Sequence, residues 1–159
     1  MSDREPAEEP ERTEEEQERL NRQMTELLNE LRVAMPGVQV LFAFLLTVPF
    51  QQRFQGVTGF QRDVYFIALL AAMTATAFLI APSAYHRIAF GQHDKPQIIA
   101  LGTVQFICGL VALAIAMNCA VLLVTDFLFQ ATTVVATLIA LGTLFASLWF
   151  GVGLWRRFR

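Results

Sequence analysis

Two amide side chains stand out because polar groups are rare in the apolar part of this sequence. Gln39 and Gln105 each lie six to eight residues inside an apolar stretch. An amide in a bilayer seeks a hydrogen-bond partner, and interhelical bonds of this kind hold membrane helices together. Their matched depth predicts a buried polar pair, in which Gln39 and Gln105 bond each other. A polar pathway through the protein is the alternative. Asn118 is expected to bond Gln130, Thr132 or Thr133 in the same way.

A second group of candidate residues is predicted to meet at the cytoplasmic edge of the protein. These residues are Glu30, Arg32, Tyr85, His86 and Arg87. His86 could sense pH or ligate a metal together with His93. Two histidines without cysteines or paired carboxylates favour the other interpretation, which is interfacial anchoring and ion pairing with Glu30.

Ionisable groups are missing from the central part of every apolar stretch. Ion-coupled transport relies on such groups at mid-membrane. Asp126 lies between the third and fourth apolar stretches, and we interpret it as marking a tight outer turn. The sequence therefore predicts no catalytic residue, no metal site, no cofactor and no nucleic-acid partner. It favours a protein that is not an enzyme.

The elements that carry these residues follow from composition and charge. The chain is 55% hydrophobic and 16% charged, with a mean hydropathy of +0.46. Residues 1–32 hold 11 of the 14 acidic residues, whereas residues 33–159 are mostly apolar. A soluble domain carries about 25% charged residues. A polar head on an apolar body predicts a membrane protein whose direct partner is the lipid bilayer.

The expected fold is all-α, a four-helix transmembrane bundle with an N-terminal cytoplasmic amphipathic helix. Three parts are expected along the chain: a disordered acidic tail (1–12), the amphipathic helix (13–35) and a four-span membrane domain (36–159). The spans cover about 33–50, 64–82, 97–125 and 127–155. Pro36 has no amide hydrogen, so a break or bend is expected between the helix and the first span.

The amphipathic helix carries an apolar stripe at helical spacing. The stripe consists of Leu20, Met24, Leu27, Leu28 and Leu31. Three uses remain open: packing on the protein's own cytoplasmic face, pairing with the same helix of a second subunit, or lying on lipid. Two further seams of small residues favour close helix approach. They are Gln105, Gly109, Ala112, Ala116 and Ala120 in the third span, and Ala136, Ala140, Thr143, Ser147 and Gly151 in the fourth.

Lysine and arginine predict the orientation in the membrane. Ten of these residues fall on the side of the two termini and only Arg53 and Arg62 on the other. Because cytoplasmic loops carry the excess of basic residues, both termini are expected in the cytoplasm.

Two sequence strings carry a resemblance to a known family. LLNELRVAMPGVQVLFAFLLTVPF, followed by APSAYHR at the end of the second span, resembles a family of small bacterial four-span membrane proteins of unknown function. The resemblance covers roughly residues 25–158. Automatic labels in that family sometimes read "sodium:proton antiporter". The resemblance implies a multi-pass protein of the bacterial inner membrane but supplies no activity.

Together these observations predict a non-enzymatic membrane protein that acts through protein contacts, with its cytoplasmic helix meeting an unknown protein partner. The alternative is a small transporter or channel subunit, ion- or proton-coupled, that forms a homo-oligomer around the small-residue seams.

Overall fold

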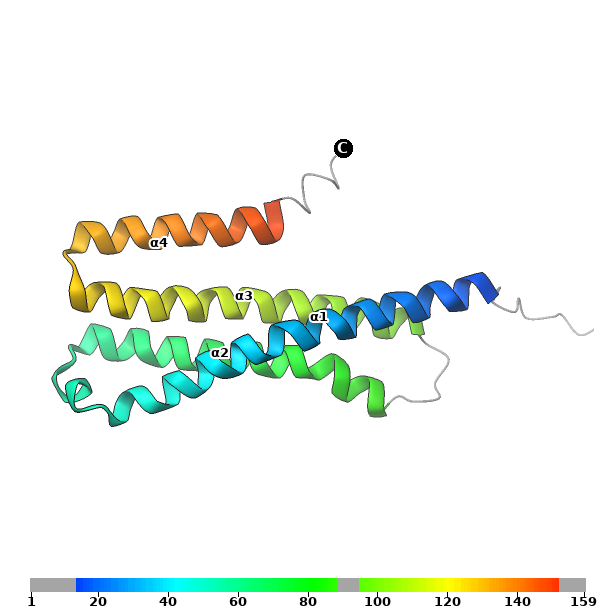
Figure 1. Cartoon of the computed structure of the whole chain (residues 1–159), viewed down its shortest axis with the longest axis horizontal. Coiled ribbons are helices and arrows are strands. Elements are labelled where there is room, and N and C mark those ends of the chain that lie inside the picture. Colours follow the sequence, from blue (N-terminus) through cyan, green and yellow to red (C-terminus); the bar gives the residue numbers. More distant parts are fainter. Residues whose placement is uncertain (1–13, 89–94, 152–159) are drawn as a thin grey trace, which may run out of the picture.

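The computed structural model describes residues 14–88 and 95–151, and these residues form helices and short connections without a strand (Figure 1). The predicted tail 1–12 lies outside them. The α-helices are α1 (Glu14–Thr47), α2 (Gly59–Ile88), α3 (Lys95–Leu128) and α4 (Ala131–Phe145). The 3-10 helices η1 (Val48–Phe50) and η2 (Gln52–Gly56) connect α1 to α2, and the π-helix η3 (Ala146–Gly151) follows α4. The all-α prediction with four apolar helices is confirmed.

Successive helices run antiparallel, so α4 runs toward the end of the molecule where α1 begins, although it stops well short of that end (Figure 1). We call this the terminal end, and the end that carries Phe50, Gly59 and Ala131 the opposite end.

The structure shows no break at Pro36. α1 is one helix of 34 residues, and Pro36 lies inside it. The predicted boundary between the amphipathic helix and the first span therefore falls within a continuous element. Proline removes one backbone hydrogen bond, and membrane helices tolerate this loss. Leu31 and Val38 lie on either side of Pro36 and pack in the same hydrophobic cluster, which holds the helix across the proline.

α1, α2 and α3 pack together around two apolar clusters. The first contains Leu27, Leu31, Val38, Ala75, Leu79 and Ala112. The second contains Leu45, Tyr65, Ala68, Ala72 and Ala116. α2 supplies a face of small residues at helical spacing, and α1 fills the space above it with leucine and valine. Small side chains let helix backbones approach closely, which is how membrane helices gain packing energy without a hydrophobic force.

Two glycines of α3 mark the tightest approaches. A Cβ at Gly109 would lie 2.9 Å from both Cγ and Cδ2 of Leu79 in α2. A Cβ at Gly102 would lie 2.9 Å from Cδ2 of Leu27 in α1. A larger residue at either position would displace these leucines. Gly109, Ala112 and Ala116 are buried, so this part of the third-span seam meets other helices as expected.

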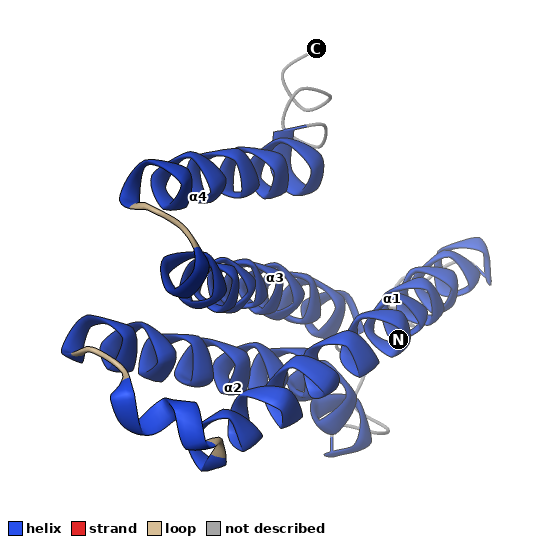
Figure 2. Cartoon of the chain, turned by 60° about the vertical axis from the view of Figure 1, so that its left-hand side comes forward, coloured by secondary structure: helices blue, strands red, loops and turns tan. Residues whose placement is uncertain are grey.

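α4 is attached differently, because it contacts α3 but neither α1 nor α2 (Figure 2). Val134 is its one buried residue. The fourth-span seam points away from the bundle, so its expected contact with another helix stays a prediction. Ala136, Ala140, Thr143, Ser147 and Gly151 are all exposed. The larger side chains of Leu138, Leu141 and Phe145 are half-buried and turn the opposite face of α4 toward α3.

Candidate functional site

The C-terminal part of the apolar stripe packs on the protein's own helices. Leu27 and Leu31 are buried in the first cluster, and Leu28 packs against it. The contact with Gly102 places Leu27 over α3, and Pro82 of α2 lies 3.6 Å from the same Cβ position. Of the three uses that the sequence left open, packing on the protein's own helices is the one observed for these three leucines.

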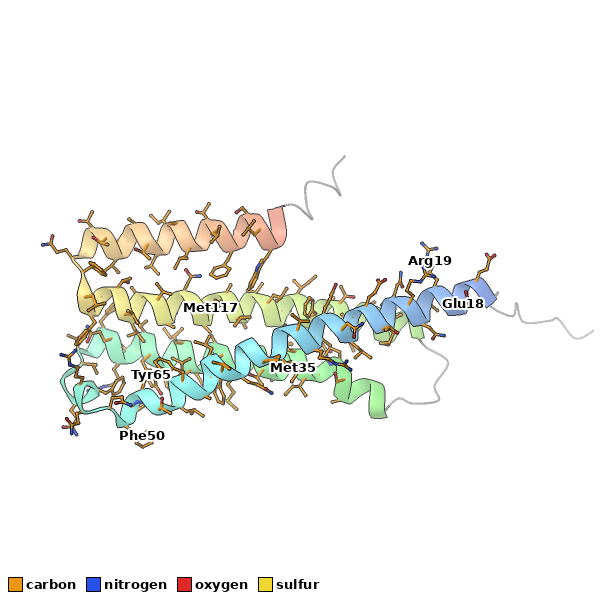
Figure 3. All side chains as sticks on the ribbon, in the orientation of Figure 1. Glu18, Arg19, Met35, Phe50, Tyr65 and Met117 are labelled. Atoms are coloured by element: carbon orange, nitrogen blue, oxygen red, sulfur yellow. The ribbon has the colours of Figure 1, made fainter. Side chains whose placement is uncertain are left out.

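The N-terminal part of the stripe is less covered by other helices. Leu20 and Met24 are half-buried, whereas their charged neighbours Glu18, Arg19 and Arg22 are exposed. Figure 3 shows Glu18 and Arg19 on the part of α1 that extends past the rest of the bundle. The stripe therefore continues beyond the docked leucines as an apolar edge on a projecting helix.

The predicted pair Gln39 and Gln105 does not form. Gln39 is exposed, and the buried Oε1 of Gln105 has no hydrogen-bond partner. The reason is the rotation of α1. Val38 is only 1% exposed and faces α2 and α3. The next residue of an α-helix is turned by about 100°, which points Gln39 away from α3.

Other polar side chains of the spans bond the backbone of their own helix. Thr76 donates to the carbonyl of Ala72 at 2.8 Å, and Thr137 donates to that of Thr133 at 2.9 Å. Asn118 donates through Nδ2 to the carbonyl of Ala114 at 2.8 Å. The expected bond between Asn118 and α4 is therefore absent. These bonds need no partner helix, and neither Gln39 nor Gln105 makes one of this kind.

Tyr65 makes a bond between helices that the sequence analysis missed. Its hydroxyl donates to the carbonyl of Leu45 at 3.0 Å, and the contact is buried. In a continuing helix this carbonyl would accept from residue 49, but Pro49 has no amide hydrogen. Tyr65 satisfies the backbone acceptor that Pro49 leaves open, and Phe54 packs against its ring at 5.0 Å. A proline four residues after an apolar helix residue was the available signal.

A network of polar side chains connects α2 and α3 at the opposite end of the molecule. Thr58 and Gln61 exchange backbone-to-side-chain bonds of 3.0 and 3.2 Å, the reciprocal pattern of a capping box, and this starts α2. Gln61 then donates through Nε2 to Oδ2 of Asp126 at 2.8 Å. Arg53 lies over the ring of Phe127 at 5.5 Å. Asp126 belongs to the last turn of α3, so the expectation that it marks the turn itself was wrong.

The cytoplasmic-edge cluster stays a prediction. Glu30 and Arg32 are exposed on α1. Tyr85, His86 and Arg87 belong to α2, but their side chains lie outside the described part of the structure, as does the whole of His93. In the described ranges, no three His, Cys, Asp or Glu side chains gather as metal ligands would.

The described residues contain four helices that are long and apolar enough to cross a membrane. They cover Glu18–Phe50, Gly59–Ala84, Ile99–Leu128 and Ala131–Trp149. The fold is that of a small multi-pass membrane protein.

A family model described as "Family of unknown function (DUF6328)" matches residues 13–153, and the chain belongs to this family. The resemblance stated from the two sequence strings is thereby confirmed. No curated protein and no solved structure matches the chain.

Proposed function

We propose that the protein is a non-enzymatic membrane protein that presents the projecting part of α1 to a protein partner. The observation that carries this proposal is that one end of the apolar stripe is buried against the bundle and the other end is not. Leu27 and Leu31 are buried against the bundle, whereas Leu20 and Met24 are half-buried beyond it. The buried pair fixes the direction of the helix, and the outer pair offers apolar contacts to another protein.

The reach of α1 supports this role. Arg32 is exposed and is the last charged residue before the uncharged stretch 33–52, which is long enough to cross the apolar core. Glu14–Arg32 would then project about 28 Å from the membrane, at 1.5 Å per residue. Glu14–Arg32 holds six glutamates and three arginines, and this net negative charge would be repelled by anionic lipid headgroups. A protein is therefore the favoured partner.

Two paired variants test the division of the stripe. Leu20→Ser with Met24→Ser should abolish photo-crosslinking from a benzophenone residue at Gln23 to a partner protein, with membrane insertion and thermal stability unchanged. Leu27→Ser with Leu31→Ser should instead lower the melting temperature in detergent, because two buried leucines leave the cluster. If the outer pair lowers stability as much as the inner pair, the whole stripe is structural and the proposal fails.

We further propose that both termini lie in the cytoplasm and that the membrane is the bacterial inner membrane. The ten-to-two distribution of lysine and arginine supports this orientation. Single cysteines at Gly56 and at Gln92, each in a chain whose Cys108 and Cys119 are replaced by alanine, should react differently with an impermeant maleimide. Labelling from outside is expected at Gly56 only. Labelling at Gln92 and not at Gly56 would reverse the orientation.

A further inference from the structure

One face of α1 inside the membrane is polar or small along its whole length. Its residues follow one another at helical spacing: Arg32, Pro36, Gln39, Ala43 and Thr47. All five are exposed. This face lies away from the Leu31, Val38 and Leu45 face, which packs on α2 and α3. Neither of those helices covers it.

Gln39 is the unusual member of this face. It lies seven residues, about 10 Å, past Arg32 and so within the apolar core. Thr47 on the same face satisfies its hydroxyl locally, by donating to the carbonyl of Phe44 at 2.7 Å. Gln39 makes no hydrogen bond with any described residue, and in a membrane its exposed amide would meet lipid, which offers neither donor nor acceptor. Such a group indicates a missing partner.

We propose that this face of α1 pairs with the same face of a second copy, and that Gln39 hydrogen-bonds Gln39 of that copy. Two copies inserted in the same orientation place Gln39 at equal depth, so the amides meet without any further adjustment. A carboxamide is self-complementary, because its NH₂ donates and its oxygen accepts. Across a two-fold axis each amide then donates to the other.

The neighbours of Gln39 suit a close helix pair. Pro36 and Ala43 lie one turn to either side and are small or compact. Small residues at such spacing let two membrane helices approach. Arg32 lies at the end of the face, where its long side chain extends to the headgroups and its charge stays in water. This contact does not depend on the projecting part of α1.

Cysteine cross-linking in membrane vesicles tests the geometry. In the chain that lacks Cys108 and Cys119, Ala43→Cys should form a disulfide dimer on oxidation. Phe44→Cys is the matched control, because Phe44 is also exposed but turned by about 100° from Ala43. A dimer from Ala43→Cys and none from Phe44→Cys supports the pairing. Equal yields, or no dimer from Ala43→Cys, would overturn it.

The role of the amide is tested by energy transfer between labelled chains diluted in lipid vesicles. Gln39→Leu should weaken dimerisation about tenfold, since two interhelical amide bonds are lost. Gln39→Asn should retain part of the affinity, and Gln52→Leu, which removes an exposed amide outside the apolar core, should leave it unchanged. Unchanged dimerisation of Gln39→Leu would refute the bond. Because none of these changes touches Leu20 or Met24, the partner proposed for the projecting helix is tested separately.

Discussion

The two sides of α3 use similar residues but pack to different extents. On one side, Leu79 of α2 lies against Gly109, and Ala112 packs in one cluster with Leu79 and the leucines of α1. On the other side, α4 contacts α3 through half-buried leucines and phenylalanine while its small residues face outward. A small residue produces a close contact only where a larger side chain on the neighbouring helix fits over it. α1, α2 and α3 therefore form the rigid unit, and α4 is an attachment to it.

The largest expected effect comes from filling the closest approach. Gly109→Leu should lower the free energy of unfolding in bicelles by about 3 kcal/mol, because its side chain would overlap Leu79 in the tightly packed unit. Gly142→Leu in α4 is the matched control. Nothing lies within 4 Å of its Cβ position, so a change within about 0.5 kcal/mol is expected. Equal losses at the two glycines would show that α4 packs as tightly as α2.

A smaller effect is expected from Tyr65→Phe, which keeps the ring and removes the hydroxyl. The carbonyl of Leu45 would remain buried without a donor, which should cost about 1–2 kcal/mol in the same unfolding measurement. Thr47→Val removes an exposed bond to the backbone of its own helix and should change stability by less than about 0.5 kcal/mol. A harmless Tyr65→Phe would mean that the Leu45 carbonyl finds another donor.

The smallest effect, and the one of opposite sign, is expected at Gln105. Its Oε1 is buried without a partner, so Gln105→Met should raise the unfolding free energy by about 0.5 kcal/mol. Methionine has a similar length and adapts to irregular space. Destabilisation by this change would show that a water molecule satisfies the amide inside the packed unit.

The sequence predicted the class of fold well because long apolar stretches and charge segregation depend on composition alone. It did not predict how each helix is rotated. Within α1 beyond Pro36, apolar residues occur on every face, so the amphipathic signal disappears where Gln39 had to be placed. The spacing of Leu31, Val38 and Leu45 at intervals of seven residues continues the docked stripe and could have shown that Gln39 faces outward. No comparable pattern selects the face of α4 that meets α3.

Asp126 and Tyr65 show a second limit of prediction from sequence, which concerns contacts between residues far apart in the chain. Their partners, Gln61 and the carbonyl of Leu45, are 65 and 20 residues away along the chain. Only the antiparallel arrangement of the helices brings these groups together. The capping box of Thr58 and Gln61 is local and readable from sequence, whereas the bond from Gln61 to Asp126 is not.

The uninterrupted course of α1 has a mechanical consequence. The helix is held at two places, Leu27 over Gly102 and the carbonyl of Leu45 at Tyr65. These points are 18 residues apart, about 27 Å along the axis. Two contacts this far apart along one helix resist tilting of α1 against α2 and α3. Turning α1 by one residue position, about 100°, would withdraw Leu31, Val38 and Leu45 from the bundle, so the face that carries Leu20 and Met24 is fixed together with them. The packing of its membrane segment thus also sets the direction in which the far end of α1 points.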